Sequence, residues 1–165
     1  MQEKLLNLVI FGFITIIVVT ASQVIGLLVL DRIPENTTLE INNFLHFTHI
    51  RNYGGVFGLL QGQGSLFAFL SGLLLSVVIL YLILARDLQR FEYVCFGFIV
   101  GGGASNVLDR IIHGSVIDFI DLQHIPYWNY IFNTADVMVH VGIWPLLLLS
   151  FMQRPRSTDE QKQTE

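Results

Sequence analysis

Two aspartates are the residues of this chain best suited to acid and base chemistry. Asp118 lies in the segment VIDFIDL and Asp136 closes the segment FNTAD, in an otherwise strongly apolar chain. Ionisable groups are costly near lipid and, where present, mark function. Two acids brought together can hold one proton between them and divide the roles of general acid and general base. We therefore predict that Asp118 and Asp136 form a catalytic pair.

Other polar residues accompany this pair in the sequence. Asp109 and Arg110 end the segment GGGASNVLDR, and a plain salt bridge between them is the alternative to a role in chemistry. We expect Arg110 to compensate Asp109 or a neighbouring acid, and Asp121 to be a solvated loop carboxylate. An amide can hydrogen-bond a peptide without adding charge, and the candidate amides are Asn52, Asn106 and Asn133.

The sequence predicts no metal site and no cofactor. His46 and His49 are three residues apart in a segment expected to be extended, which places them on opposite faces, and no HExxH motif accompanies them. His140 lies in an apolar run and is expected to form a hydrogen bond between helices. The glycines 101–103 precede no P-loop lysine, so they predict close helix packing and not a phosphate site.

The composition is that of a membrane protein. Hydrophobic residues are 53% of the 165 and charged residues 13%, with a mean hydropathy of +0.61, outside the usual balance of a soluble domain. The net charge is -4, and the sequence has no stripe of basic residues that could neutralise the phosphates of a nucleic acid. No nucleic-acid partner is therefore expected. Cys95 is the only cysteine, which excludes an intramolecular disulfide. We expect one mainly α-helical domain over residues 1–165.

Four apolar runs are long enough to cross a membrane as helices, at about residues 5–30, 66–85, 93–110 and 135–152. The third is expected to be shorter and, with Gly97 and Gly101 four residues apart, to pack closely against another helix. A cleaved signal peptide is the alternative for the first run. That alternative is disfavoured because the apolar residues continue past the possible cleavage site at Ala21 to Leu30.

The segments between these runs predict a polar region at one membrane face. Residues 31–64 alternate apolar and polar side chains in LEINNFLHFTHIRN, which favours a few short strands on the membrane surface. Basic residues fall mainly on the other side of the four-helix arrangement: Lys4, Arg86, Arg90, Arg154, Arg156 and Lys162 against Arg32, Arg51 and Arg110. The positive-inside rule then places both termini, with the tail 153–165, in the cytoplasm and the candidate site at the extracytoplasmic face.

Four segments of the chain together resemble a known motif set. RNYGGVF, GGGASNVLDR, VIDFIDL and FNTAD, in this order between the apolar runs, are similar to the motifs of the bacterial lipoprotein signal peptidases, or signal peptidase II. The resemblance implies an aspartyl protease of the bacterial inner membrane. Such a protease removes signal peptides from diacylglyceryl-modified prolipoproteins on the amino side of the lipidated cysteine. Its implied partners are these substrates and membrane lipids, and we expect a monomer.

The resemblance also assigns roles to residues. Asp118 and Asp136 match the catalytic dyad, and Asp109 matches the acid of the DR pair. The residues that match substrate-positioning or supporting groups are Asn52, Asn106, Arg110 and Asn133. The predicted surface strands match an extracytoplasmic β-cradle, and the aromatic loop 123–130 matches a flap over the site, between the third and fourth helices.

One stretch departs from the family pattern. Members usually carry an Asp-Gln pair in the first span and a lysine four residues after the Asp, where this chain has Ser22, Gln23 and Gly26. The two charges would lie one helical turn apart, so their joint loss leaves the net charge unchanged. The change suggests a divergent paralogue, and an inactive protein that binds lipoproteins or lipid stays open as an alternative. A small proton or ion transporter is a second alternative, although the acids cluster at one face and no paired repeat is evident.

Overall fold

The computed structural model describes residues 2–55 and 59–152, and four long helices dominate this part of the chain. They are α1 (Gln2–Arg32), α2 (Gly64–Leu84), α3 (Arg90–His113) and α4 (Thr134–Met152). All four are long and apolar enough to cross a membrane, which confirms the predicted helices. The tail 153–165 lies outside the described residues.

Helix α3 is longer than the sequence predicted. It has 24 residues, against 21 in α2, so the expectation of a shorter third span was wrong. A capping box between Gln89 and Glu92 begins the helix before the apolar run does. Gly114, with a left-handed φ of 71°, ends it after the DR pair. Polar residues at both ends therefore belong to the helix although they interrupt the apolar pattern.

Helix α3 also packs against each of the other three helices. Gly97 and Gly101 lie against α1, where a Cβ added at Gly101 would lie 2.7 Å from the Cβ of Val18. On other sides of α3, Gly102 lies against Ala135 of α4 and Gly103 against Leu75 of α2. The predicted close packing through these glycines is confirmed, and it makes α3 the central helix.

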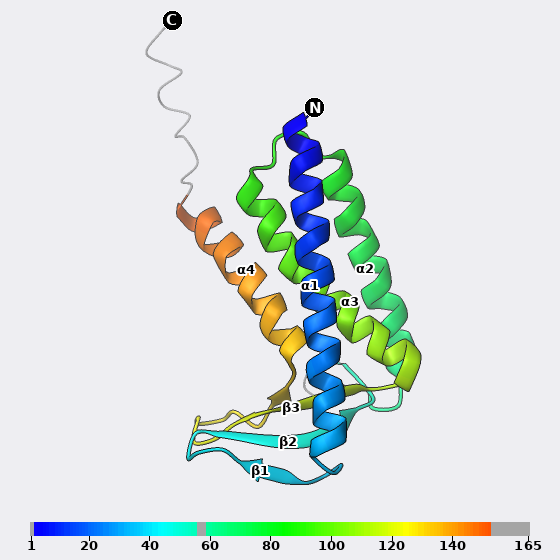
Figure 1. The fold of residues 1–165 in the computed structure, drawn as a ribbon, viewed down its shortest axis with the longest axis vertical. Coiled ribbons are helices and arrows are strands. Elements are labelled where there is room, and N and C mark those ends of the chain that lie inside the picture. Colours follow the sequence, from blue (N-terminus) through cyan, green and yellow to red (C-terminus); the bar gives the residue numbers. More distant parts are fainter. Residues whose placement is uncertain (1, 56–58, 153–165) are drawn as a thin grey trace, which may run out of the picture.

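A four-stranded antiparallel sheet lies at one end of the helices, opposite the beginning of α1 and the end of α4 (Figure 1). Its order is β1 (Thr38–Glu40), β2 (Leu45–Asn52), β3 (Val116–Leu122) and β4 (Ile131–Phe132). The sequence predicted strands only within residues 31–64. Strands β3 and β4, from the segment between α3 and α4, complete the sheet.

The sheet is fixed to α1 by an apolar cluster. Val29 and Ile33, at the end of α1, pack against Ile117 and Phe119 of β3. Successive side chains of a strand point to opposite faces. Asp118, between these two apolar residues, therefore points away from the cluster and toward the beginning of α4, where it meets Asn133.

Candidate active site

Asp118 is a buried acid on the central strand β3, with 1% of its surface exposed. The side-chain amide of Asn133 donates to its Oδ1 at 2.7 Å, and that of Asn52 donates to its Oδ2 at 3.0 Å. Burial raises the pKa of Asp118 to about 7; the charge of Asp136 also raises it, and the two amides and Arg110 oppose the rise. Near neutral pH this carboxyl group can therefore hold a proton.

Asp136 lies in the first turn of α4 and is held as a hydrogen-bond acceptor. Its Oδ2 accepts from the backbone N–H of Asn133 at 3.3 Å, while Asn133 Oδ1 accepts from the backbone N–H of Asp136 at 3.0 Å. This reciprocal pattern is a capping box. Asn106 on α3 donates to Asp136 Oδ1 at 2.8 Å. Asp136 is thus held by one backbone donor and one side-chain donor at the beginning of α4.

Asn133 joins the two acids. Its side-chain nitrogen donates to Asp118, its backbone nitrogen donates to Asp136, and the same side-chain nitrogen lies 3.2 Å from Asn106 Oδ1. Within the part of the chain that the structure describes, no hydrogen bond links the two carboxyl groups directly. The structure thus brings the predicted pair together through an amide.

The neighbouring DR pair does not form a salt bridge. Arg110 donates to the carbonyl oxygens of Gly54 at 2.9 Å and of Asn106 at 3.2 Å, whereas Asp109 accepts from Gln23 of α1 at 2.8 Å. The salt bridge between these two residues, which the sequence left open, is absent because consecutive helix residues point about 100° apart. Arg110 ties the loop after β2 to α3 and lies close enough to lower the pKa of Asp118.

Two further expectations were wrong. Asp121 is a strand residue of β3 and accepts a hydrogen bond from Thr48 of β2 at 2.8 Å, so it is no loop carboxylate. His140 makes its hydrogen bond within α4, from Nδ1 to the carbonyl oxygen of Asp136 at 2.8 Å. Its side chain lies on an exposed face of the helix.

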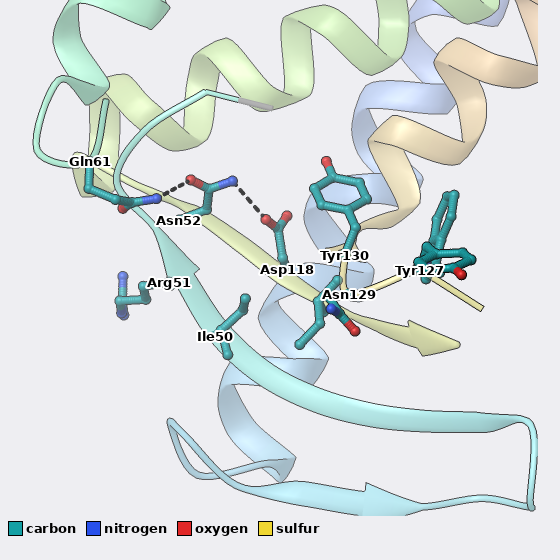
Figure 2. Close-up of a pocket in the computed structure, with 10 residues that line it drawn as sticks. Ile50, Arg51, Asn52, Gln61, Asp118, Tyr127, Asn129 and Tyr130 are labelled. Atoms are coloured by element: carbon teal, nitrogen blue, oxygen red, sulfur yellow. Dashed lines mark hydrogen bonds between the residues drawn. The ribbon is translucent and has the colours of Figure 1, made fainter. Parts of the chain in front are cut away.

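A cavity of about 390 Å³ opens beside Asp118. Figure 2 shows Gln61 donating to Asn52 Oδ1 at 3.4 Å and Asn52 donating to Asp118, which gives a chain of amides along one wall. Residues 127–130 of the predicted flap line the opposite side. Burial, followed by the charges of Asp136 and Asp118, raises the pKa of Tyr130 above its usual value. Gln61 and Tyr130 were not singled out from the sequence, where neither belongs to a spaced motif.

Ser22 and Gly26, where the chain departs from the family pattern, lie behind the site. They line a narrow pocket together with Asp109 and Asn133. Ser22 is 8% exposed, and its hydroxyl has no hydrogen-bond partner. Ser22 thus lies near Asn133, in a pocket that neither Asp118 nor Asp136 lines.

The arrangement suits hydrolysis by a pair of carboxyl groups. Asp118 is buried and can be neutral, Asp136 accepts hydrogen bonds from two donors, and each adjoins a cavity large enough for a peptide segment. Such a pair can donate a proton and take another in the same reaction.

Comparisons with known proteins give matches over most of the chain. A family model for signal peptidase (SPase) II matches residues 14–152. A lipoprotein signal peptidase of Clostridioides difficile (strain 630) is 35% identical over 130 residues, which cover 78% of this chain and 86% of that protein. One of Nostoc punctiforme is 34% identical over 118 residues, covering 72% and 73%. A solved bacterial membrane enzyme at 1.9 Å resolution matches with a TM-score of 0.75 and 26% identity, over 87% of this chain and 92% of that one.

Proposed function

The chain belongs to the signal peptidase II family, and from this membership we infer that it removes signal peptides from bacterial prolipoproteins. We propose that it does so as an aspartic endopeptidase, with Asp118 and Asp136 as the catalytic residues. The observation that carries this proposal is the position of Asn133, which links a buried acid beside one cavity to a helix-capping carboxyl group beside the neighbouring cavity. Because both aspartates are present, the chain is better explained as an active enzyme than as an inactive protein that binds lipoproteins or lipid.

The two acids take different roles in the proposed reaction. Asp136, as carboxylate, takes a proton from water, and the hydroxide adds to the scissile carbonyl carbon while neutral Asp118 protonates the carbonyl oxygen. The tetrahedral diol collapses when Asp136 gives its proton to the leaving nitrogen and Asp118 recovers one from the diol. The C–N bond breaks, one water is consumed, and both acids return to their starting states.

The supporting residues hold this pair and its substrate. Asn106 orients Asp136, Asn52 orients Asp118, and Arg110 fixes the loop that carries Gly54. We propose that the substrate is a prolipoprotein with a diacylglyceryl-modified cysteine, cut on the amino side of that cysteine. The scissile peptide would enter between β2 and the aromatic flap, where amide groups line the cavity.

We further propose that the protein lies in the bacterial cytoplasmic membrane with its site at the extracytoplasmic face. Lys4, Arg86 and Arg90 belong to one end of the helices, and Arg32, Arg51 and Arg110 belong to the end that carries the sheet. The remaining basic residues follow α4 in the sequence. This asymmetry supports cytoplasmic termini.

Cleavage of a diacylglyceryl-modified prolipoprotein by the purified chain tests the proposal. Asp118→Asn and Asp136→Asn should each reduce kcat by several orders of magnitude, because an amide is nearly isosteric but cannot exchange the required proton. Asp121→Asn, on the same strand as Asp118, is the matched control and should keep activity. Wild-type turnover by either dyad variant, with folding verified by thermal unfolding, would contradict the assignment.

A further inference from the structure

A second cavity lies along α4, on the other side of the aromatic flap from Asp118. It has a volume of about 450 Å³ and is lined mainly by apolar groups, among them Leu122, Phe132 and Val137. Asp136 lies in its wall, and His140 lies one helical turn further along α4. We call this cavity the α4 groove.

The α4 groove adjoins the cavity that contains Asp118. Trp128 and Tyr130 line both this groove and the cavity that contains Asp118, so the flap forms the wall between them. The wall consists of packed aromatic rings. The ring of Tyr130 is stacked on that of Phe132 with 6.1 Å between their centroids, and the ring of Trp128 lies edge-on to Phe132 with 6.2 Å between their centroids. Each acid of the pair thus borders a different cavity.

The groove lies where α4 meets the sheet, at the level expected for the membrane surface. Further along α4, Trp144 and Leu148 are 63% and 62% exposed, as expected for side chains that face lipid in a spanning helix. Tryptophan and tyrosine, which line the groove, are enriched at such interfaces. The cavity between α2 and α3, by contrast, is lined by Arg110 but by neither acid.

We propose that the α4 groove binds one acyl chain of the lipid on the substrate's modified cysteine. This inference rests on the proposed function, because the lipid is bonded to the residue directly after the scissile bond. An acyl chain must therefore leave the site beside the acids and return to the membrane, and the α4 groove is an apolar path that begins at Asp136. An acyl chain in a bilayer is already in an apolar environment, so the groove positions the scissile bond and adds little hydrophobic driving force.

Filling the groove provides a kinetic test. Val137→Phe places a larger side chain in its wall, and Val141→Phe, one turn along the same helix and outside the groove, is the matched control. The measurement is kcat/KM for two lipidated prolipopeptides, one with long acyl chains and one with chains shortened to a few carbons. We expect the wild type and Val141→Phe to prefer the long chains by about tenfold or more, and Val137→Phe to lose most of this preference.

Fluorescence tests binding without cleavage. Trp128 and Trp144 are the only tryptophans, so Trp144→Phe leaves Trp128 in the groove wall as the single probe. The ligand is a peptide that begins at a diacylglyceryl-modified cysteine with brominated acyl chains, which leaves no bond to cleave. Its bromines should quench Trp128 relative to the unbrominated peptide, and Val137→Phe should weaken the quenching whereas Val141→Phe should not.

The outcomes separate the two proposals. The groove assignment would be overturned if Val137→Phe lowered kcat/KM equally for both chain lengths. It would also be overturned if Val137→Phe left the quenching of Trp128 intact. If Val137→Phe does not fold, Leu122→Phe at the sheet side of the groove is tested in the same way. A wild-type protein that cleaves neither peptide contradicts the proposed function, whereas quenching still reports whether the groove binds the acyl chain.

Discussion

At the residue scale, Asn133 uses its side-chain amide and its backbone N–H within the site. Its side-chain nitrogen donates hydrogen bonds to Asp118 and Asn106. Its backbone N–H donates to the carboxyl group of Asp136, and its side-chain oxygen accepts from the backbone N–H of Asp136. An aspartate at this position would add a third acid, and an alanine would remove the link between the catalytic residues. The single amide thus fixes the spacing of the pair and the first turn of α4 together.

The raised pKa of Asp118 predicts a pH-dependent stability. The folded chain holds the proton of Asp118 up to about pH 7, whereas an unfolded chain releases it near pH 4. Between these values the folded state binds more protons, so the free energy of unfolding contributed by this group falls as the pH rises. The Asp118→Asn variant has no such proton to lose. Its free energy of unfolding, relative to that of the wild type, should therefore increase from pH 4 to pH 7 by on the order of a few kcal/mol, and then level off.

Thermal unfolding in one detergent across this pH range measures the effect. Asp87→Asn, at the exposed turn between α2 and α3, is the control for the loss of a carboxylate. A difference between Asp118→Asn and the wild type that stays constant from pH 4 to pH 7 would show that Asp118 is ionised throughout this range, and would remove its assignment as the acid.

The sequence predicted the acids and asparagines of the site because polar residues are rare in this chain and their motifs follow one another in order. It did not predict Gln23 or Gln61. Gln61 belongs to no motif, and Gln23 was noted only within the stretch that departs from the family pattern. The role of each depends on which elements meet: Gln23 faces α3, and Gln61 faces the end of β2. The direction of Arg110 could not be predicted either, because its acceptors are backbone carbonyls.

At the element scale, the glycines of α3 predict a contrast in stability. Gly101→Ala places a Cβ against Val18 at 2.7 Å, whereas a Cβ at Gly72 of α2 has no neighbour within 4 Å. We expect Gly101→Ala to lower the free energy of unfolding by ~1 to 3 kcal/mol, as overpacking does, and Gly72→Ala to leave it unchanged or slightly raised. Thermal unfolding of both variants checks this, and an equal loss in both would contradict the assigned packing.

Helix α1 lacks the two charges that family members usually carry in the first span, and both can be restored at Ser22 and Gly26. Ser22→Asp would place a second negative charge beside Asp109, in a pocket whose described lining residues include no cation. We expect this change to lower the free energy of unfolding. The loss would be about 2.5 to 3.5 kcal/mol at the bilayer centre and less toward the membrane surface. Gly26, one turn further, has open space for a side chain, so adding Gly26→Lys should recover the stability by pairing the charges. We expect KM to change more than kcat, because Ser22 contacts neither acid.

Stability and steady-state cleavage are compared for the wild type, both single variants and the double variant. A Ser22→Asp protein as stable as the wild type would mean that Ser22 is more solvated than its burial indicates. A double variant altered mainly in kcat would place this stretch closer to the acids.

The elements themselves were predictable in part. The helices followed from long apolar runs, and β1 and β2 followed from alternation within residues 31–64. Strand β3 was missed because VIDFIDL alternates imperfectly and forms a strand only when β2, more than 60 residues earlier in the chain, pairs with it. The sheet that positions Asp118 is thus a long-range contact, which local patterns do not report.

At the scale of the whole molecule, the apolar surface lies outside and the polar network lies at one end. Large hydrophobic side chains such as Phe13, Leu74 and Leu148 are more than 60% exposed, as expected where lipid surrounds the helices. The buried polar groups Asn52, Asp118 and Asn133 lie between the sheet and the ends of α3 and α4. Such a molecule fits a membrane in only two orientations, and the site faces opposite sides of the membrane in the two.

The orientation of the protein in the membrane can be measured by labelling single cysteines. Cys95 is the only cysteine and is buried, so Cys95→Ala gives a background into which single cysteines can be placed at exposed positions. Glu40→Cys lies on the edge strand β1 and Asp87→Cys on the turn between α2 and α3, at opposite ends of the helices. If the basic residues set the topology, a membrane-impermeant maleimide should label Glu40→Cys in intact spheroplasts and Asp87→Cys only after permeabilisation. Cleavage activity in both variants verifies the fold, and the reverse labelling pattern would place the catalytic pair at the cytoplasmic face.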